Sequence, residues 1–362
     1  MEGIEDSIVF LDLHGSRLLE AGLFVRVGGV NMELKQLGEF ALIDKIKLDT
    51  ICYQDSVVLG IGDDAAAFVP VPRLLQLVTT DMLVEKVHFD LSTSDARQLG
   101  YKSVAVNLSD IAAMGGKPTH VVTAIALPEY LPVDFVVALY EGMKEICREF
   151  GVNIIGGDTV SSPNGLVINV TAMGEVEPER LQRRSGARVG DIIAVTGTVG
   201  DSGCGLELLQ QQQWQEQEFF LPLSRRHLTP KPQVRAGGML AALGSTSMND
   251  ISDGLASEIH EIAKASHVGM RIYKGKIPLS PEVRAASLAM GKEGAEYALY
   301  GGEDYQLLFT ISPDRIVSLS QVELGLEWTV IGEVVPESRK IMLVAEDETE
   351  SVLEPKGYNH FR

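Results

Sequence analysis

Five aspartates could together bind metal ions, because each lies beside small or polar residues in a separate part of the chain: Asp64, Asp81, Asp110, Asp158 and Asp250. Each is flanked by glycine or by Ser, Thr and Asn, and no matching concentration of cationic residues accompanies them. Oxygen ligands of this kind suit Mg²⁺ and other hard cations. Because so many ionised carboxylates cannot share a pocket without cations, the sequence predicts that these segments converge on several magnesium ions.

Asp110 carries the strongest argument, because it lies in a mostly apolar segment. Residues 94–115 are predicted to form a helix whose second half is buried, since apolar residues recur there at helical spacing. Asn107 and Asp110 lie three residues apart on one face, with no Lys or Arg between Asn107 and Gly116. A buried carboxylate is costly without a cation, so the partner of Asp110 must come from another segment.

A second group of oxygen ligands follows a predicted strand. Residues 74–80 are predicted to form a strand that ends in Thr79, Thr80 and Asp81, and His88 follows seven residues after Asp81. Polar oxygens at a strand end suit a hard cation. His88 is open to two interpretations, a structural histidine or a substrate contact.

Glycine precedes an acid at two further positions. Residues 152–155 are predicted to form a strand that stops at a Gly-Gly pair followed by Asp158. Glycine there would let the backbone approach a phosphate closely, with Asp158 beside it. Asp63 and Asp64 follow a glycine turn, and a solvated turn explains Asp63 better than Asp64.

The second half of the chain supplies further candidates. Arg184 lies beside a turn from which it could reach a phosphate, whereas Arg183 is equally compatible with a solvated surface. Ser252 is predicted to be the N-cap of the helix that follows it. The helix dipole accounts for Asp253 but leaves Asp250 unexplained.

Near the carboxyl end, a glycine pair again precedes acids. Glu303 and Asp304 are predicted to lie at the edge of the strand that follows them. The terminal segment KGYNHFR is either a lid or a tail.

The elements that position these residues are predicted to form two α/β domains. Further predicted elements are a strand at 121–127, a helix at 133–150 and a strand at 166–175. The first domain is expected at 32–178 and the second at 179–362, a length sufficient for two cores. Residues 1–31 lack periodicity and are predicted to be a disordered extension, in preference to an independent arm.

Composition limits the classes of partner. The chain has 362 residues and a net charge of −19, with 50 acidic and 31 basic residues. This balance argues against nucleic acid or an anionic membrane as a partner, but not against phosphorylated substrates, because divalent cations can bridge carboxylates and phosphates. Three cysteines without a CxxC pair, no long apolar run and no signal peptide indicate a cytoplasmic protein with reduced thiols.

Seven short segments occur in the order VLGIGDDAA, TTDMLVEKVHF, AVNLSDIAAMGG, GGDT, RSGARVGD, NDISDGL and GGEDYQLLFT, whereas the P-loop motif GxxxxGK[ST] and the short protein-kinase signatures are absent. Together the seven segments resemble the thiamine-monophosphate kinase family, within the superfamily typified by aminoimidazole ribonucleotide synthetase. The likeness runs from about Gly38 to His360. A single motif such as GGDT is weak, but seven in order are highly specific.

The resemblance implies a transferase that moves the γ-phosphoryl group of ATP to thiamine monophosphate, giving thiamine diphosphate. It implies a two-domain α/β fold with mixed sheets, in which the N-terminal sheet meets its twin in a homodimer and the C-terminal domain covers the nucleotide. ATP is then a co-substrate, and several Mg²⁺ ions are bound.

The resemblance also implies roles for individual residues. The magnesium ligands are Asp64, Thr79, Thr80, Asp81, Asp110, Asp158, Asp250 and Asp253. The ATP contacts are Gly157, Asp158, Arg184, Ser252 and Tyr140. The contacts to thiamine monophosphate are His88 and Glu303.

Two departures from the family pattern affect these roles. Val160 and Ser161 follow Thr159 where some members continue GGDTTR, so a basic residue near the phosphates is missing. Pro355 stands where some members have an aromatic residue, and Tyr358 could substitute for it.

The implied chemistry agrees with the abundance of acids. A phosphate monoester is already a nucleophilic anion at neutral pH, so no side chain needs to act as a general base. The site must neutralise charge and align two phosphates, which magnesium held by carboxylates can do. We therefore expect no catalytic side chain in the strict sense and the greatest sensitivity at Asp110.

Three alternatives remain open from the sequence. A synthetase of the same superfamily would use ATP to activate an amide or selenide, but Cys52 lacks the neighbouring lysine expected of a selenophosphate synthetase. A two-metal phosphatase would need water at the metals, whereas a kinase must exclude it. A regulatory protein would bind nucleotide without turnover.

Overall fold

The computed structural model describes residues 34–37, 39–61 and 65–358. The predicted extension at 1–31 and the candidate ligand Asp64 therefore lie outside the described residues.

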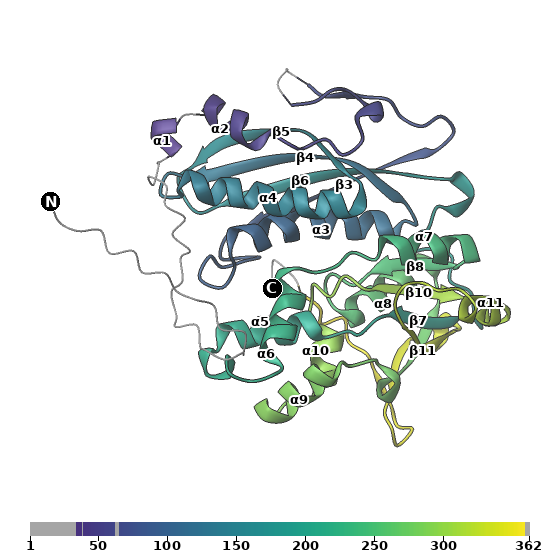
Figure 1. Cartoon of the computed structure of the whole chain (residues 1–362). Helices are drawn as coiled ribbons and strands as arrows, with labels where there is room; N and C mark the ends of the chain where they lie inside the picture. Colours follow the sequence, from purple (N-terminus) through teal and green to yellow (C-terminus); the bar gives the residue numbers. More distant parts are fainter. Residues whose placement is uncertain (1–33, 38, 62–64, 359–362) are drawn as a thin grey trace, which may run out of the picture. The chain divides into compact units, whose positions relative to one another are not determined.

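The first half of the chain is built on a four-stranded sheet with the order β3-β6-β4-β5. Its strands are β3 (Leu75–Val84), β4 (Lys117–Pro128), β5 (Asn153–Ser162) and β6 (Val167–Val176). Strands β4 and β5 are parallel, whereas β6 is antiparallel to both β3 and β4. Helices α3 (Ala96–Ala113) and α4 (Val133–Phe150) lie along one face of this sheet (Figure 1).

Helix α3 confirms the predicted helix around Asp110. It begins after Asp95, whose carboxylate accepts a hydrogen bond from the Gln98 backbone N–H at 2.8 Å, while the Gln98 side chain accepts one from the Asp95 N–H. This reciprocal cap satisfies two backbone donors. Helix α4 packs closely on α3 because Gly100 has no side chain: a Cβ there would lie 1.8 Å from the Leu139 carbonyl oxygen.

Two strands are longer than the sequence predicted. Strand β3 does not end at Thr80, because its backbone pairs with β6 from Leu75 to Val84. Strand β5 does not stop at residue 155, because it pairs with β4 as far as Ser162. The polar residues that were expected after strand ends therefore lie within hydrogen-bonded strands.

Five short elements precede the four-stranded sheet in the described part of the chain. They are the helices α1 (Leu34–Leu37) and α2 (Glu39–Ile46), the 3₁₀ turn Gln54–Ser56, and the antiparallel pair β1 (Val57–Leu59) and β2 (Ala67–Phe68). The His120 ring of β4 lies 4.5 Å from the Phe68 ring, centroid to centroid, so this segment covers part of the sheet face opposite to α3 and α4.

The second half contains a seven-stranded sheet with the order β13-β12-β9-β11-β7-β10-β8. Its strands are β7 (Ile192–Thr196), β8 (Ser247–Asp250), β9 (Gly269–Tyr273), β10 (Leu307–Ile311), β11 (Trp328–Val335), β12 (Ile341–Val344) and β13 (Glu350–Val352). Its helices are α5 (Asp201–Gln210), α6 (Phe220–Leu228), α7 (Val234–Leu243), α8 (Leu255–Ser266), α9 (Pro281–Met290), α10 (Gly294–Tyr300) and α11 (Ile316–Ser320). All its strand pairs are antiparallel except β12 with β9.

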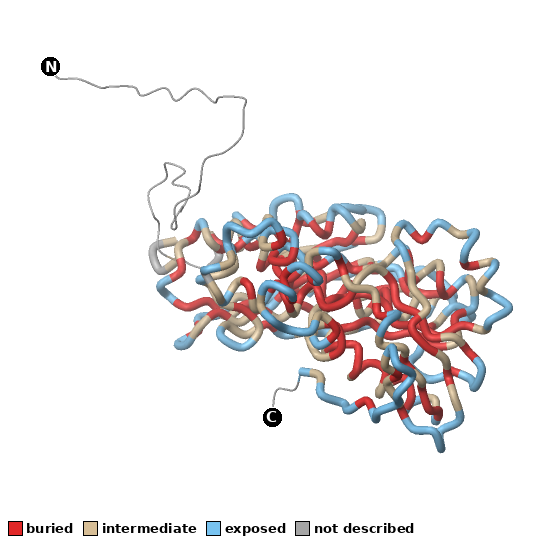
Figure 2. The backbone as a smooth tube through the Cα atoms, turned by 90° about the horizontal axis from the view of Figure 1, so that it is seen from below, coloured by how far each residue is buried: buried red, intermediate tan, exposed pale blue. Residues whose placement is uncertain are grey.

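Helix α3 connects the two halves. It packs on β3 and β6 of the first sheet and also contacts α6, α7 and β8 of the second half. Figure 2 shows that the buried stretches of backbone lie in the interior, with exposed residues in the loops around them. No helix in the described part of the chain is long and apolar enough to cross a membrane.

Candidate active site

A cavity of about 1380 Å³ opens beside strand β3, bordered by α5, α10 and the last described residues of the chain. Seven of the predicted site residues line it: Thr80, Asp81, His88, Ser252, Asp253, Glu303 and Tyr358. Residues that are distant in the sequence therefore share one cavity.

Asp110 and Asp250 lie near Asp81 and complete a cluster of acids. Thr79 Oγ1 donates a hydrogen bond to Asp110 Oδ2 at 2.5 Å, and Ser109 Oγ donates one to Asp250 Oδ2 at 2.7 Å. Asp250 is the last residue of β8 and is only 3% exposed. Strand β3, helix α3 and strand β8 thus deliver three carboxylates to one place, which we call the acidic cluster: Asp81, Asp110 and Asp250.

The pKa values of the cluster reflect its crowding. Burial, followed by the charges of Asp110 and Asp253, raises the pKa of Asp81 to about 6. Burial raises the pKa of Asp110, although the hydrogen bond from Thr79 and the charge of Arg184 oppose the rise. Burial and the neighbouring Asp110 raise the pKa of Asp250 well above its ordinary value. The three carboxylates repel one another, so a bound cation would stabilise their ionised forms.

The chemistry of these donors fits magnesium, which prefers carboxylate oxygens. Among the residues that the structure describes, no three His, Cys, Asp or Glu side chains stand in a ready-made metal-binding arrangement. The argument for magnesium here is the oxygen chemistry of the crowded carboxylates in the acidic cluster.

Thr80 faces away from its neighbours in the strand. Thr79 and Asp81 pair with the buried Ala172 and Val170 of β6, on the face covered by the helices. Successive side chains of a strand point to opposite faces, so the side chain of Thr80 points to the other face. There its Oγ1 lies 2.9 Å from Thr171 Oγ1 and donates to the Val170 carbonyl oxygen at 3.1 Å.

The structure does not bring Asp158 to the acidic cluster. Asp158 lies on β5, whereas Asp81 lies on β3 at the opposite edge of the four-stranded sheet, roughly 14 Å away across three strand spacings. It is exposed and pairs with the exposed Ala124, so it belongs to the face away from α3 and α4. At Gly157 a Cβ would lie 2.1 Å from the Thr123 carbonyl oxygen, so this glycine permits close pairing with β4.

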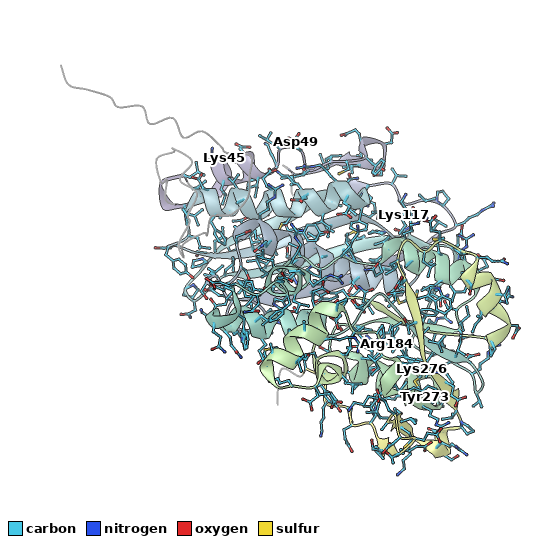
Figure 3. All side chains as sticks on the ribbon, turned by 60° about the horizontal axis from the view of Figure 1, so that its bottom comes forward. Lys45, Asp49, Lys117, Arg184, Tyr273 and Lys276 are labelled. Atoms are coloured by element: carbon cyan, nitrogen blue, oxygen red, sulfur yellow. The ribbon has the colours of Figure 1, made fainter. Side chains whose placement is uncertain are left out.

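Arg184 is tied to the acidic cluster through a chain of polar contacts, and Figure 3 marks its position in the second half of the chain. Its Nε donates to Asn249 Oδ1 at 3.0 Å, and Asn249 in turn donates to the carboxylate of Glu258 on α8. Glu258 also accepts a hydrogen bond from the Asp253 backbone N–H at 3.1 Å. Burial raises the pKa of Glu258 to about 7. These contacts fix the loop that carries Asp250 and Asp253.

The prediction that Ser252 caps the next helix is wrong. Helix α8 begins at Leu255, and the residue before it is Gly254, which has a φ of 100°. The Ser252 hydroxyl instead donates to Glu258 at 3.4 Å. The turn through Gly254 separates Ser252 from the helix end, so Ser252 is left to line the cavity.

A buried lysine supports Glu303 at the other side of the cavity. Lys102 of α3 is 3% exposed, and its Nζ lies 2.7 Å from Glu303 Oε2. His227 of α6 approaches the same oxygen with Nδ1 at 3.3 Å. Burial, and then the charge of Lys102, lower the pKa of His227 to about 3, so His227 is neutral at physiological pH.

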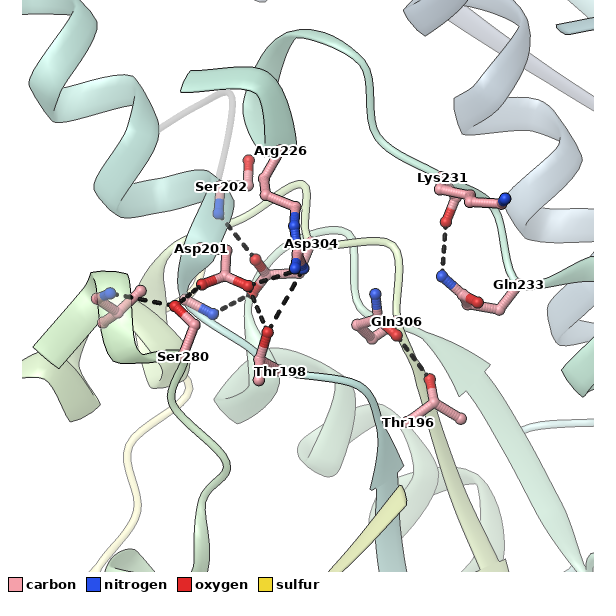
Figure 4. A network of polar contacts seen from close by, with 12 residues as sticks. Thr196, Thr198, Asp201, Ser202, Arg226, Lys231, Gln233, Ser280, Asp304 and Gln306 are labelled. Atoms are coloured by element: carbon pink, nitrogen blue, oxygen red, sulfur yellow. Dashed lines mark hydrogen bonds and ion pairs between the residues drawn. The ribbon is translucent and has the colours of Figure 1, made fainter. Parts of the chain in front are cut away.

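The loop that carries Glu303 is anchored from below by Asp304. Its carboxylate accepts hydrogen bonds from the backbone N–H groups of Gly200 at 2.6 Å and Ser202 at 3.0 Å, at the start of α5. Figure 4 shows the surrounding network, in which Asp201 binds Arg226 at 3.0 Å. Asp304 thus fixes the loop before β10 and with it the position of Glu303.

His88 and Tyr358 are held by backbone contacts. The Val84 N–H donates to His88 Nδ1 at 3.0 Å, and the Tyr358 N–H donates to the Asp253 carbonyl oxygen at 3.1 Å. Both residues line the cavity, whereas Pro355 does not.

Tyr140 has a packing role in this structure. It is 3% exposed in the core of the first half, and its hydroxyl lies 3.0 Å from Thr123 Oγ1. It does not line the cavity, so the expected contact to ATP has no support from its position.

Four residues of the site could not be singled out from the sequence: Lys102, His227, Asn249 and Glu258. Each has its partners in another segment of the chain, so the sequence around it did not reveal its role. One signal was available for Lys102: a lysine within a buried helix needs an anionic partner, by the same reasoning that was applied to Asp110.

Two family models match the chain. AIR synthase related protein, N-terminal domain, matches residues 62–176, and AIR synthase related protein, C-terminal domain, matches residues 188–345. These matches agree with the expected two-domain α/β fold.

Curated relatives and solved structures agree with the family models. Thiamine-monophosphate kinase of Bacillus subtilis (strain 168) is 39% identical over 333 residues, covering 90% of this chain and 100% of that protein. The crystal structure of thiamine-monophosphate kinase from Stenotrophomonas maltophilia K279a has a TM-score of 0.76 at 36% identity and covers 86% of this chain and 97% of that one. AaThiL complexed with AMPPCP and TMP has a TM-score of 0.73 at 37% identity and covers 92% of this chain and 100% of that one.

Proposed function

The chain belongs to the thiamine-monophosphate kinase family, and on this basis we propose that it phosphorylates thiamine monophosphate with ATP to give thiamine diphosphate. We further propose direct in-line transfer of the γ-phosphoryl group, organised by several Mg²⁺ ions.

The observation that carries this proposal is the acidic cluster beside the cavity. Asp81, Asp110 and Asp250 come from three elements, burial raises the pKa of each, and the charge of Asp110 adds to the rise at Asp81 and Asp250. A protein that binds two phosphorylated anions needs cations beside its acids, and these residues are placed to hold them.

Individual residues can then be given roles. Asp81, Asp110, Asp250 and Asp253 hold Mg²⁺, with Thr79 orienting Asp110. Magnesium, when bound, supplies the charge neutralisation that lets two phosphates approach. Arg184, held by Asn249, and Ser252 are assigned to the nucleotide phosphates. His88, Glu303 and Tyr358, which line the same cavity, are assigned to thiamine monophosphate.

Several expectations remain predictions without a supporting contact. They are metal binding by Asp64, Thr79, Thr80 and Asp158, nucleotide binding by Gly157, Asp158 and Tyr140, a cytoplasmic location, and the absence of nucleic-acid and membrane partners. The effect of Val160 and Ser161 after Thr159 also remains a prediction.

A homodimer through the four-stranded sheet is also proposed. The face of this sheet away from α3 and α4 exposes large apolar side chains, with Val78 at 71%, Met82 at 53% and Val160 at 50% exposure. A second copy of the sheet would cover such a face.

The test is to incubate the purified protein with Mg²⁺, ATP and thiamine monophosphate and to follow thiamine diphosphate and ADP together. The proposal expects equal amounts of the two products. ATP consumption without thiamine diphosphate would favour a synthetase or a phosphatase, and binding without consumption would favour a regulatory protein.

A further inference from the structure

We propose that Lys102 is a positioning residue, which holds the carboxylate of Glu303 in the orientation that receives the cationic thiazolium ring of thiamine monophosphate. This inference rests on the proposed function and adds the part of the substrate that the Glu303 side of the cavity recognises.

The ion pair crosses from one half of the chain to the other. Lys102 belongs to α3, and Glu303 lies in the loop before β10. The Lys102 side chain is 3% exposed, whereas that of Glu303 is 23% exposed and lines the cavity. The lysine therefore lies behind the carboxylate, at 2.7 Å, and leaves Glu303 as the group that meets a ligand.

The protonation of His227 follows from the donors around it. Lys102 Nζ lies 3.5 Å from His227 Nε2, and because a lysine ammonium can only donate, Nε2 must be the acceptor. The proton of the neutral ring is thus on Nδ1, which faces Glu303 Oε2 at 3.3 Å and Ser202 Oγ at 3.0 Å. Lys102 then donates to Glu303 Oε2, and the Nδ1–H of His227 lies beside the same oxygen and is hydrogen-bonded with the Ser202 hydroxyl.

The charge balance leaves Glu303 ionised. Burial raises the pKa of Glu303, but the charge of Lys102 and its hydrogen bond act against this rise, and the net pKa is lowered. An ionised carboxylate in a partly buried cavity attracts a cation more strongly than it would in bulk water. Thiamine monophosphate offers such a cation in its quaternary thiazolium nitrogen, whereas ATP offers none.

The backbone of the loop explains why the carboxylate needs support. Glu303 has a φ of 67° and Tyr305 a φ of 50°, both in the left-handed region that is unfavourable for residues other than glycine. Asp304 between them is fixed to the start of α5. Asp304 anchors the backbone of the loop to the start of α5, and Lys102 holds the side chain of Glu303.

Helix α3 links this contact to the acidic cluster. Lys102 and Asp110 lie eight residues apart on α3, about 12 Å along its axis. One helix therefore carries both a member of the acidic cluster and the lysine that contacts Glu303. We expect Asp110 to act at the phosphate end of thiamine monophosphate and Lys102, through Glu303, at the ring end.

The test compares Lys102→Met, Lys102→Arg, Glu303→Gln and the double variant Lys102→Met/Glu303→Gln. The matched control is Lys144→Met, because Lys144 is also buried, at 4% exposure, and pairs with Glu141 at 3.0 Å within α4. Steady-state assays measure KM for thiamine monophosphate, KM for ATP and kcat.

Lys102→Met is expected to raise KM for thiamine monophosphate about ten-fold or more, because a charged contact loses its support. KM for ATP should stay within about two-fold of the wild-type value, and Lys102→Arg should restore part of the loss. The double variant should be no worse than Glu303→Gln alone, and Lys144→Met should leave both KM values unchanged.

An unchanged KM for thiamine monophosphate in Lys102→Met, or an equal rise in both KM values, overturns the inference while the wild-type enzyme still makes thiamine diphosphate. If Lys102→Met does not fold, the test uses Glu303→Gln instead. An unchanged KM for thiamine monophosphate in Glu303→Gln overturns the inference. If the wild-type protein makes no thiamine diphosphate, the proposed function fails and the inference fails with it.

Discussion

Thr79 and Asp110 are joined by a hydrogen bond of 2.5 Å between the Thr79 hydroxyl and the Asp110 carboxylate. The contact connects β3, at the edge of the first sheet, to α3, the helix that packs against both halves of the chain. It leaves Asp110 with one oxygen bound by a neutral donor, which orients the carboxylate without neutralising it. A neutral donor orients a metal-binding carboxylate and leaves its full charge for the metal ion.

The first prediction concerns this hydrogen bond. Thr79→Val removes the hydroxyl, keeps a similar shape and should raise the Mg²⁺ concentration needed for half-maximal activity about ten-fold or more, because a hydrogen bond to a charged group is worth about 1.5–3 kcal/mol. Thr79→Ser keeps the hydroxyl and should stay close to wild type. A magnesium titration of kinase activity checks both variants, and equal behaviour of the two would contradict a role for the hydrogen bond.

The second prediction concerns stability without metal. Asp250→Asn should raise the melting temperature measured without Mg²⁺, because it removes a buried negative charge that repels Asp110. The same variant should gain less stability than wild type when Mg²⁺ is added. Asp191→Asn is the matched control: Asp191 is also buried, at 4% exposure, and accepts hydrogen bonds from the Arg188 backbone N–H and the Thr246 hydroxyl, but it lies outside the acidic cluster. Its replacement relieves no crowding there and should lower the melting temperature. A lower melting temperature for Asp250→Asn than for wild type would argue against crowding in the acidic cluster.

The third prediction concerns pH. The folded pKa of Asp81, about 6, lies above its ordinary value of 3.8, so its contribution to stability is present below about pH 4 and is lost as the pH rises through about 6. Mg²⁺ binds the ionised carboxylates and should reverse this loss. The rise in melting temperature on adding Mg²⁺ should therefore be small at about pH 5 and larger at about pH 7.5.

The buried His227 changes stability in the opposite direction. The pKa of His227 is lowered to about 3 from 6.5, so its contribution is present above about pH 6.5 and is lost as the pH falls. The contribution of His227 is the same in samples with and without Mg²⁺, so it cancels when their melting temperatures are compared at the same pH. A magnesium effect that shrinks as the pH rises would be inconsistent with binding at the acidic cluster.

The fourth prediction concerns the proposed dimer. The double variant Val78→Lys/Met82→Lys places two charges on the exposed sheet face and should yield monomers in sedimentation velocity experiments, whereas the wild-type chain is expected to sediment as a dimer. Leu288→Lys on α9 is the control, because Leu288 is equally apolar and 84% exposed but lies outside this sheet. A double variant that remains dimeric would place the interface elsewhere.

Much of the first half could be predicted from the sequence, because its signals are local. The apolar periodicity predicted α3 within two residues at each end, and α4 was predicted with its observed bounds. The ends of β3 and β5 were wrong, because pairing with β6 and β4 extends these strands through polar residues. Polar residues in these segments indicated that the strands end there, but where the strands end is determined by their pairing with distant segments.

The site was predictable in part for the same reason. The sequence predicted that Asp110, Asp81 and Asp250 converge, and the latter two acids do lie beside the partly buried Asp110. Asp158 shows the same sequence pattern but lies on the far edge strand, because sheet order cannot be read from spacing along the chain. Lys102 and Glu303 are far apart in the sequence and became visible as a pair only in the folded chain.

The central claim is that acids from distant segments hold the magnesium that brings two phosphates together. The measurement that tests it most directly is the rate of thiamine diphosphate formation by Asp110→Asn at saturating Mg²⁺, compared with the control Asp191→Asn. The account predicts that Asp110→Asn loses at least about 100-fold in kcat, equivalent to about 3 kcal/mol, while Asp191→Asn stays within a few-fold of wild type. If Asp110→Asn forms thiamine diphosphate at the wild-type rate, the acidic cluster does not organise the transfer.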